Sequence, residues 1–183
     1  MLRQGDPGST VILILSGRAK VVYSAPDGTE TLLSIRGPGD VIGEMACTTD
    51  EPRSATVQAL EPVDARVIPF GEFTDLVKQF SWGVPLQRYW VDRLRQACQL
   101  TWRIPAQSPQ RKIAALFVAL LETGNTHSVP MTQQEIADMF GLSRRTVGEV
   151  LRQWQRHGFI LVRRSRMEII EPGRIRSMLP YGM

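Results

Sequence analysis

Residues 132–147 read TQQEIADMFGLSRRTV, and this stretch decides the fold of the C-terminal third of the chain. Thr132 and Glu135 match a capping box, in which the two side chains bind free amides at the start of a helix. Gly141 is the residue type that ends such a helix in the left-handed conformation. Ser143 then provides an N-cap for a second helix. The stretch therefore predicts two helices joined by a tight turn.

The arrangement of these helices is typical of a helix-turn-helix. We expect the first helix to end near Phe140 and the second near His157, where Gly158 follows. Ala137 is small at the place where the two helices would cross closely. Five apolar residues are expected to face inward, namely Ile136, Phe140, Leu142, Val147 and Val150. Because a plain helical hairpin would not need Ala and Gly at these places, the pattern favours a DNA-binding module.

The second helix of such a module enters the major groove, where its first residues approach the base edges. Arg144 or Arg145 is expected to make a bidentate contact to guanine, and Glu149 is expected to accept from cytosine. Residues 159–162 and 167–170 predict two strands, and the arginines of the turn between them are placed to hold phosphates. The predicted DNA-contacting residues are Gln134, Ser143, Arg144, Arg145, Glu149, Arg152, Arg163, Arg164 and Arg166.

The charge of the chain is concentrated in this last third. The net charge is +4, and residues 131–183 hold nine arginines against five acidic residues. The remainder holds 13 basic and 13 acidic residues, so it is neutral. A basic module on a neutral remainder indicates a polyanionic partner for that module, with a solubilising surface as the alternative.

The first seventy residues predict short strands separated by turn-forming residues. Pro26-Asp27-Gly28 is such a turn, because Pro fixes φ and Gly tolerates a positive φ. The expected strands are residues 11–15, 19–23, 31–35, 56–60 and 65–69. Many short strands with Gly and Pro between them indicate an antiparallel sandwich or barrel.

The periodicity becomes helical after residue 70. Residues 72–80 predict a short helix, and the residues from Pro85 to Ile104 allow a second helix of about 30 Å. Along this helix, steps of four, three, four and three residues separate five positions in turn, namely Trp90, Leu94, Ala97, Thr101 and Ile104, a 4-3-4-3 spacing. The spacing is typical of a coiled-coil seam between two copies of the chain, and a single helix packed on its own sheet is the alternative.

Residues 105–109 contain two prolines and are expected to form a hinge. Ser108 with Pro109 begins a further helix, and residues 125–130 are expected to form a loop. The apolar stripe of this helix ends before Gly124 and consists of Ile113, Leu116, Phe117, Leu120 and Leu121. The expected domains are residues 1–83, which are rich in strands, the long helix 84–104, and the helix-turn-helix domain 105–183.

Composition and motifs argue against several other classes of protein. No stretch approaches the ~20 apolar residues of a membrane helix, and the polar start has no secretory character, so we expect a cytoplasmic protein. Cys47, Cys98, His127 and His157 match no zinc spacing, and the two cysteines are expected to be buried apolar fillers. No nucleophile–base pair, metal cluster or phosphate-loop motif is present, so we expect neither an enzyme nor a required cofactor.

Nearly the whole chain resembles the CRP/FNR family of bacterial regulators. The best markers are residues 134–137 (QEIA) with 141–147 (GLSRRTV), and Gly43-Glu44 followed by residues 52–56 (PRSAT). The resemblance implies an α+β fold with an N-terminal antiparallel β-roll, a long dimerisation helix and a C-terminal winged helix-turn-helix. It also implies a cytoplasmic homodimer that binds double-stranded DNA and RNA polymerase, and whose DNA-binding domains are reoriented by a ligand or a redox event.

The chain departs from this family at its start. Family members usually carry one further helix and strand before the segment that matches Gln4-Gly5-Asp6. The β-roll is therefore expected to lack its first elements and to expose a sheet edge, which favours aggregation.

The resemblance also implies an effector site for a cyclic nucleotide, either cAMP or cGMP. Backbone amides near Gly43 and Met45 would hold the phosphate, Arg53 and Ser54 would donate to it, and Glu44 would accept from the ribose hydroxyl. In the alternative reading, Glu44 and Arg53 simply pair, and the chain is a constitutive or thiol-responsive regulator with a vestigial nucleotide cassette.

The purine end of the site differs from cAMP-responsive members. Two adjacent hydroxyl residues of the long helix reach adenine in those proteins, and Ala97-Cys98 stand at the matching positions. Arg93 matches a family arginine near the ligand, and Cys98 is a further candidate contact or thiol sensor. Specificity for the base is therefore expected to have moved to cGMP, to be loose, or to be lost.

The recognition helix differs from the catabolite-activator type as well. Arg145 and Glu149 stand where that type has other residues, which predicts a different operator.

Overall fold

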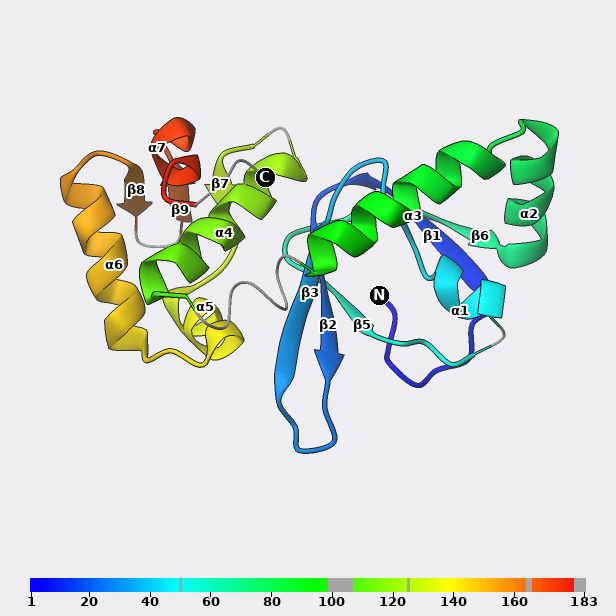
Figure 1. Cartoon of the computed structure of the whole chain (residues 1–183), viewed down its shortest axis with the longest axis horizontal. Helices are drawn as coiled ribbons and strands as arrows, with labels where there is room; N and C mark the ends of the chain where they lie inside the picture. Colours follow the sequence, from blue (N-terminus) through cyan, green and yellow to red (C-terminus); the bar gives the residue numbers. More distant parts are fainter. Residues whose placement is uncertain (50, 99–106, 125, 164–165, 180–183) are drawn as a thin grey trace. The chain divides into compact units, whose positions relative to one another are not determined.

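A computed structural model describes residues 1–49, 51–98, 107–124, 126–163 and 166–179 of the chain (Figure 1). The chain divides into two compact units, Met1–Gln99 and Leu100–Met183. Among the described helices, none combines the length and apolar character needed to cross a lipid bilayer.

Six strands of the first unit form two antiparallel three-stranded sheets. One sheet has the order β4-β1-β6 and the other the order β3-β2-β5. The strands are β1 (Thr10–Ser16), β2 (Ala19–Ser24), β3 (Glu30–Arg36), β4 (Val41–Ile42), β5 (Thr56–Ala59) and β6 (Asp64–Pro69). All five predicted strands of this region are therefore confirmed, with each end within one residue of its predicted position, and only the two-residue β4 was missed.

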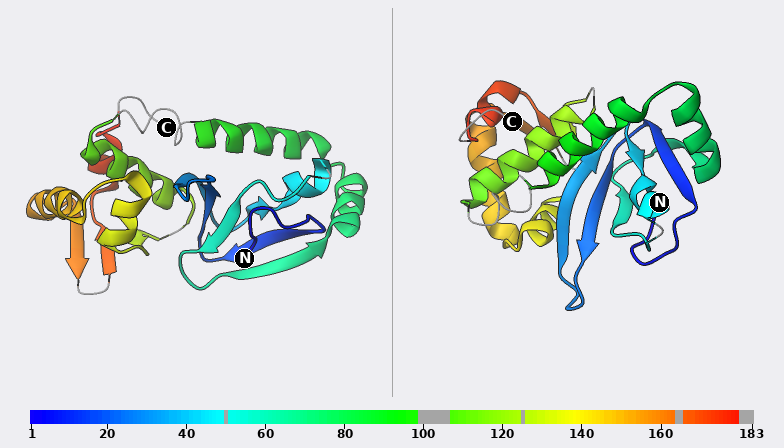
Figure 2. Two further views of the ribbon diagram at one scale, coloured as in Figure 1. Left: turned by 90° about the horizontal axis from the view of Figure 1, so that it is seen from below. Right: turned by 45° about the vertical axis from the view of Figure 1, so that its right-hand side comes forward.

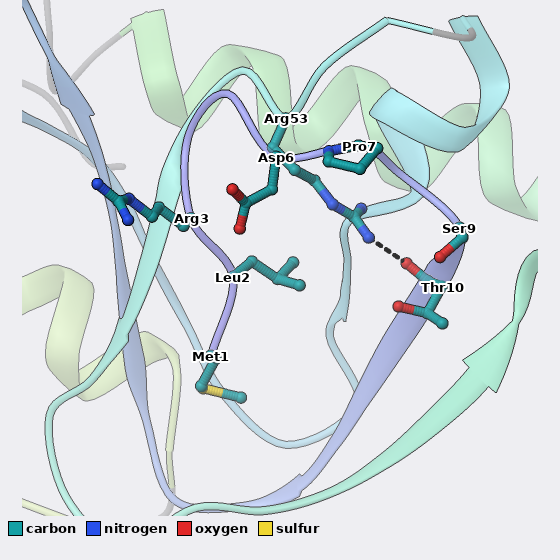
Figure 3. A pocket seen from close by; sticks show the side chains of 8 residues that line it. All are labelled: Met1, Leu2, Arg3, Asp6, Pro7, Ser9, Thr10 and Arg53. Atoms are coloured by element: carbon teal, nitrogen blue, oxygen red, sulfur yellow. Dashed lines mark hydrogen bonds between the residues drawn. The ribbon is translucent and has the colours of Figure 1, made fainter.

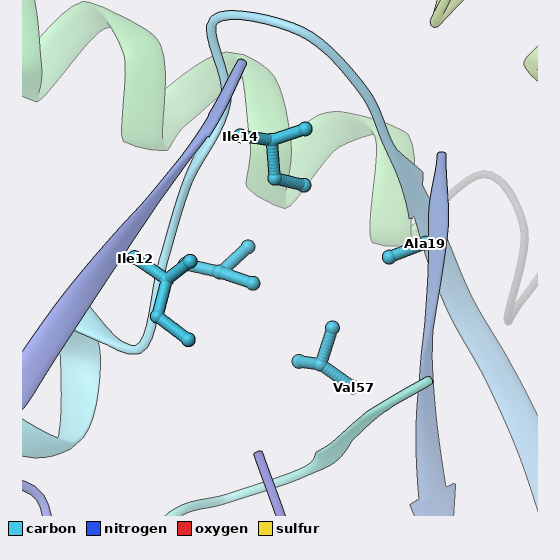
Figure 4. Packing of buried hydrophobic residues seen from close by; sticks show 5 residues of the cluster. Ile12, Ile14, Ala19 and Val57 are labelled. Carbon is cyan, nitrogen blue, oxygen red and sulfur yellow. The ribbon is translucent and has the colours of Figure 1, made fainter. Parts of the chain in front are cut away.

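The core of this unit lies between the two sheets, as Figure 4 shows. It contains Ile12, Ile14, Ala19, Ile42 and Val57, all buried. Each sheet contributes one apolar face, so the unit is an open β-roll and the sheets do not close into a barrel. At its start Leu2 forms an isolated antiparallel bridge with Val57, so residues at the beginning of the chain cover part of the β5 edge.

Three helices complete the first unit: α1 (Glu44–Thr49), α2 (Phe70–Gln79) and α3 (Gly83–Cys98). The left view of Figure 2 shows α3 running along the β-roll. It begins two residues before Pro85, which stands in the first turn, where a missing N–H does no harm. Thr101, Ile104 and Pro105 of the predicted seam and hinge lie outside the described residues.

The second unit contains four helices and one sheet among its described residues. The helices are α4 (Pro109–Glu122), α5 (Gln133–Phe140), α6 (Arg144–Arg156) and α7 (Pro172–Arg176). The strands β7 (Ser128–Val129), β8 (Ile160–Arg163) and β9 (Arg166–Ile169) pair in the order β7-β9-β8. The expected loop at 125–130 is thus wrong in part, because Ser128 and Val129 pair with Glu168 and Met167.

The core of the second unit is built around α4, whose predicted apolar stripe is confirmed. Ile113, Leu116, Phe117 and Leu120 are fully buried, whereas Leu121 is half-buried. Trp154 of α6 is also fully buried and meets Phe117 edge to face, with ring centroids 5.6 Å apart. This contact fixes α6 against α4, so it also sets the direction in which α6 leaves the core.

Candidate functional site

The two helices of the second unit begin and end as their residues predict. Thr132 accepts from the Glu135 amide at 3.2 Å, and the Glu135 carboxylate accepts from the Thr132 amide at 2.7 Å. Gly141 ends α5 with φ of 60°, in the left-handed region. Ser143 caps α6 by accepting from the Thr146 amide at 3.0 Å. The two helices are therefore fixed by local hydrogen bonds, independently of any partner.

Most residues expected to face inward do so. Ile136, Ala137 and Val147 are fully buried, while Phe140, Leu142 and Val150 are half-buried. Gly148 is buried as well, and a Cβ there would lie 3.2 Å from the Gln133 side-chain oxygen. The close crossing of α5 and α6 thus involves Gly148 in addition to Ala137, a role that the sequence analysis did not assign.

The outer face of α6 is polar. Ser143, Arg144, Arg145, Glu149 and Arg152 are all exposed. Arg145 Nε donates to Glu149 Oε1 at 2.9 Å, one helical turn away, and this contact raises the pKa of Arg145. On α5, exposed Gln134 donates to Asp138 at 2.7 Å. Arg144 takes no part in an ion pair among the described residues, which leaves its guanidinium available for a base edge.

The hairpin of β8 and β9 forms a wing. Arg163 pairs directly with Arg166, so both strands extend one residue farther into the predicted turn than expected. Arg163 is exposed, whereas Arg164 and the side chain of Arg166 lie outside the described residues. A hollow of about 500 Å³ lies beside the wing and is lined in part by Gln134, Arg144 and Arg163. Three predicted DNA contacts from α5, α6 and β8 therefore share one surface depression.

The predicted nucleotide cassette lies on the first unit, at the start of α1. Gly43 has φ of 88°, which an L side chain rarely adopts, and it turns the chain from β4 into α1. Glu44 is buried at the first position of this helix, whereas Met45 and Ser54 are exposed. Burial raises the pKa of the Glu44 carboxyl above its ordinary value.

Arg53 is held by backbone carbonyls. Only 5% of its surface is exposed, and its guanidinium donates to the carbonyls of Gly43 and Thr10, the latter at 2.7 Å (Figure 3). The backbone of Arg53 also bonds Gly5 and Asp6 at 2.8 Å each. No ion pair joins Glu44 to Arg53, although both residues are described. The simple pairing of these two side chains is therefore not what holds the cassette together.

Two cavities meet at the cassette. The smaller, of about 80 Å³, is lined by residues that include Gly43, Glu44 and Ser54. The larger, of about 310 Å³, is lined by Met1, Arg3, Asp6, Pro7, Ser9 and Thr10 (Figure 3). Leu2 and Arg53 line both. Because small-ligand sites typically have about 300–1,000 Å³, a nucleotide in the smaller cavity would require its lining side chains to move.

A polar cluster joins the β-roll to α3. The Tyr89 hydroxyl lies 3.1 Å from the Val41 amide, the Val41 carbonyl and Asp40 Oδ1. Arg93 lies 3.5 Å from the same Asp40 oxygen and 4.9 Å from the centre of the Tyr89 ring. Burial and the Asp40 charge raise the pKa of Tyr89. Sequence reasoning assigned no role to Asp40 or Tyr89, because their contact joins residues 49 positions apart.

Arg93 and Cys98 are not brought to the smaller cavity. Arg93 donates to Gln96 at 2.9 Å besides its contact to Asp40, and Cys98 is an exposed free cysteine at the end of α3. Neither lines the cavity that contains Glu44. Cys47 is half-buried, with its sulfur 3.6 Å from the Thr10 carbonyl. The expectation that both cysteines are buried is therefore wrong for Cys98 and holds only in part for Cys47.

Comparison with known proteins agrees with both units. Residues 1–80 match the cyclic nucleotide-binding domain, and residues 111–178 match the Crp-like helix-turn-helix domain. The chain belongs to the CRP/FNR family. Members of this family are transcription regulators, and this chain is accordingly a DNA-binding regulator with the α+β fold that the sequence predicts.

Several members of the family are similar over most of their length. The chain is 28% identical over 169 residues to the CRP-like cAMP-activated global transcriptional regulator of Mycobacterium tuberculosis, covering 86% of this chain and 74% of that one. It is 26% identical over 176 residues to the cAMP-activated global transcriptional regulator Vfr of Pseudomonas aeruginosa, covering 90% and 82%. A CRP/FNR-family regulator from Thermus thermophilus superposes with a TM-score of 0.74 at 22% identity, covering 97% and 92%.

Proposed function

We propose that the chain is a homodimeric transcription regulator whose DNA affinity is controlled by a cyclic nucleotide bound in the β-roll. The observation that carries the proposal is the cassette, in which Gly43, Glu44 and Arg53 gather around one cavity. Relatives named as cAMP-activated regulators support the same class of ligand. RNA polymerase is the further partner proposed for the DNA-bound form.

Each cassette residue has a distinct task. The start of α1 offers free amides, and Arg53 offers a buried cation, so together they would bind the cyclic phosphate. The exposed Ser54 hydroxyl would add a third donor. Glu44, which is buried without a basic side chain in ion-pair contact among the described residues, would accept from the ribose 2′-hydroxyl. Phosphate and ribose thus anchor the ligand at the α1 end.

The signal would pass to α3 through the cluster of Asp40, Tyr89 and Arg93. Asp40 directly precedes β4, and Val41, the first residue of β4, lies two residues before Gly43 of the cassette. Widening the cavity would move this segment, and the bonds of Tyr89 to Val41 transmit the movement to α3. A ligand controls the protein in this way only if it binds the two conformations unequally.

The surface of α3 supports a dimer. None of its described residues is buried, and Val84, Val91 and Leu94 are 59%, 47% and 64% exposed. An apolar helix face of this kind is stabilised by packing against a second copy. Leu94 belongs to the seam predicted from the 4-3-4-3 spacing, and Trp90 and Ala97 of that seam are half-buried.

The competing function is a regulator that responds to thiol chemistry. The exposed Cys98 at the end of α3 is the observation that favours it. Calorimetric titration of the full chain with cAMP and with cGMP, followed by DNA binding with and without the nucleotide, separates the two. Saturable binding that raises DNA affinity supports nucleotide control. Binding of neither nucleotide, with DNA affinity that changes only after Cys98 is alkylated, contradicts it.

Nucleotide affinity is expected to fall as the pH falls through the raised pKa of Glu44. The 2′-hydroxyl donates to the charged carboxylate, and protonation removes this charge and converts one of the two acceptor oxygens into a donor. Because burial raises this pKa, the loss begins at a higher pH than it would for an exposed glutamate. Titrations between pH 4.5 and 7.5 check this, and Glu44→Gln is expected to bind weakly at every pH in that range. An unchanged slope in Glu44→Gln would assign the pH dependence to another group.

Arg144→Ala is expected to relax specificity at one base pair of each half-site and to weaken binding by about 1–3 kcal/mol. The reason is that Arg144 is exposed in the first turn of α6 and is suited to the two acceptors of a guanine. Selection from a random duplex library identifies the site. Arg156→Ala, at the far end of α6, is the matched control and should keep the same base preferences. An equal loss of affinity on all sequences would make Arg144 a phosphate contact.

A further inference from the structure

Arg36 is a cation that the functions assigned above do not use. It is the last residue of β3 and lines the same small cavity as Glu44 and Arg53. Its guanidinium has a single long hydrogen bond, from Nη1 to the Ile35 carbonyl at 3.5 Å. Within the described parts of the chain it forms no ion pair. Most of its five donors therefore have no protein acceptor that the structure provides.

Neither of the two carboxylates near Arg36, those of Asp40 and Glu44, forms an ion pair with it among the described residues. Asp40 accepts from the Gly37 amide at 2.8 Å, and it contacts both Tyr89 and Arg93. Glu44 is buried in the cassette. Burial lowers the pKa of Arg36, and the positive charge of Arg93 lowers it further. Tyr89 and the charges of Asp40 and Glu44 offset part of this decrease. A half-buried cation with unfilled donors favours a ligand that brings acceptors.

The position of Arg36 indicates which part of the ligand it meets. The cassette residues proposed to bind the phosphate, Arg53 and Ser54, lie between α1 and β5 in the chain. Arg36 ends β3, which β2 separates from β5 in the sheet. Val21 of β2 lines the cavity as well and offers an apolar surface to a ring. A nucleotide anchored by its phosphate at Arg53 would therefore direct its base toward Val21 and Arg36.

Base chemistry then selects between the two purines. Guanine presents two acceptors, O6 and N7, on the edge that a planar guanidinium matches with two parallel hydrogen bonds. Adenine presents N7 as an acceptor but an N6 donor beside it, which opposes the N–H groups of arginine. We propose that Arg36 reads the base and that the cavity takes cyclic GMP in preference to cyclic AMP. This inference rests on the nucleotide site proposed above.

The test is calorimetric titration of the full chain and of Arg36 variants with cGMP, cAMP and cyclic IMP. The wild-type chain should bind cGMP at least about 10-fold more tightly than cAMP, because one bidentate contact distinguishes them. Cyclic IMP, which keeps O6 and N7 but lacks the 2-amino group, should bind like cGMP. Arg36→Leu should weaken cGMP binding by about 10- to 100-fold and change cAMP binding by less than about 3-fold.

Arg36→Gln provides a second, opposite prediction. A glutamine amide matches the N6–N7 edge of adenine, so this variant should prefer cAMP. Arg53→Lys is the control for the phosphate end and should weaken both nucleotides by similar factors. Circular dichroism of each variant shows whether it is folded.

The outcomes separate this inference from the function it rests on. Equal losses of affinity for both nucleotides in Arg36→Leu, or a wild-type preference for cAMP, would overturn the role of Arg36. The proposed nucleotide site would then still be supported. Binding of neither nucleotide by the folded wild-type chain would overturn both. Tight binding of a cyclic dinucleotide that depends on Arg36, with no binding of cGMP, would assign Arg36 to a second phosphate and overturn the role as a base reader.

Discussion

Arg53→Ala is expected to abolish nucleotide binding and to lower the free energy of unfolding by about 2–5 kcal/mol. The loss of stability arises because two carbonyls lose the charged hydrogen bonds that Arg53 donates. Arg53 is 95% buried, and its guanidinium donates to the carbonyls of Gly43 and Thr10, which belong to segments 33 residues apart. Removing it leaves both carbonyls without this donor and removes the cation proposed for the phosphate. One side chain thus supports the fold and the ligand site together.

Because Arg53→Ala affects folding as well as binding, a second variant is needed. Arg53→Lys keeps the charge but lacks the planar fork that reaches both carbonyls, so it should unfold at a lower temperature yet remain folded at 20 °C. Ser54→Ala is the matched neighbour, since Ser54 is exposed and its loss should leave stability within about 0.5 kcal/mol. Urea unfolding and calorimetric titration of the three variants check this. Full nucleotide affinity in folded Arg53→Lys would mean that the ligand needs only the positive charge at this position and not the guanidinium group.

Trp154→Ala is expected to destabilise the chain by about 3–5 kcal/mol, as large deletions from a core do. Trp154 is fully buried in α6, and it meets Phe117 of α4 edge to face. Its loss leaves a cavity between α6 and α4, which loosens the helix that carries Arg144, so DNA binding should be lost under conditions where the wild-type chain binds. Urea unfolding followed by circular dichroism gives the free energy, and a gel-shift assay gives the DNA affinity.

Trp154→Phe tests the same site with a smaller change. The Trp154 indole N–H is buried without a hydrogen-bond partner among the described residues. Phenylalanine keeps an aromatic ring for Phe117 and removes this unpaired donor, so it should cost less than about 2 kcal/mol. Gln155→Ala, on the exposed side of α6, should change stability by no more than about 0.5 kcal/mol. Similar losses in Trp154→Phe and Trp154→Ala would mean that the indole group itself is indispensable.

The sequence by itself determined the DNA-binding module to a large extent. The capping box of Thr132 and Glu135, the left-handed Gly141 and the N-cap Ser143 all act within four residues of their partners. Such interactions depend on the local chain alone, so residue type and spacing suffice to predict them. The five main strands of the β-roll followed for the same reason, because short runs of residues between turn-forming residues define them locally.

Only the tertiary structure decided which residues surround the nucleotide site. Arg36, Glu44 and Arg53 come from β3, α1 and the segment before β5, and they line one cavity only because the two sheets face each other. The contacts of Tyr89 with Val41 span 48 residues. Likewise, the segment that was expected to be a loop contains β7, because Ser128 and Val129 pair with a strand about 40 residues later in the chain. The packing of distant elements brings these groups together, and no local pattern of residues records it.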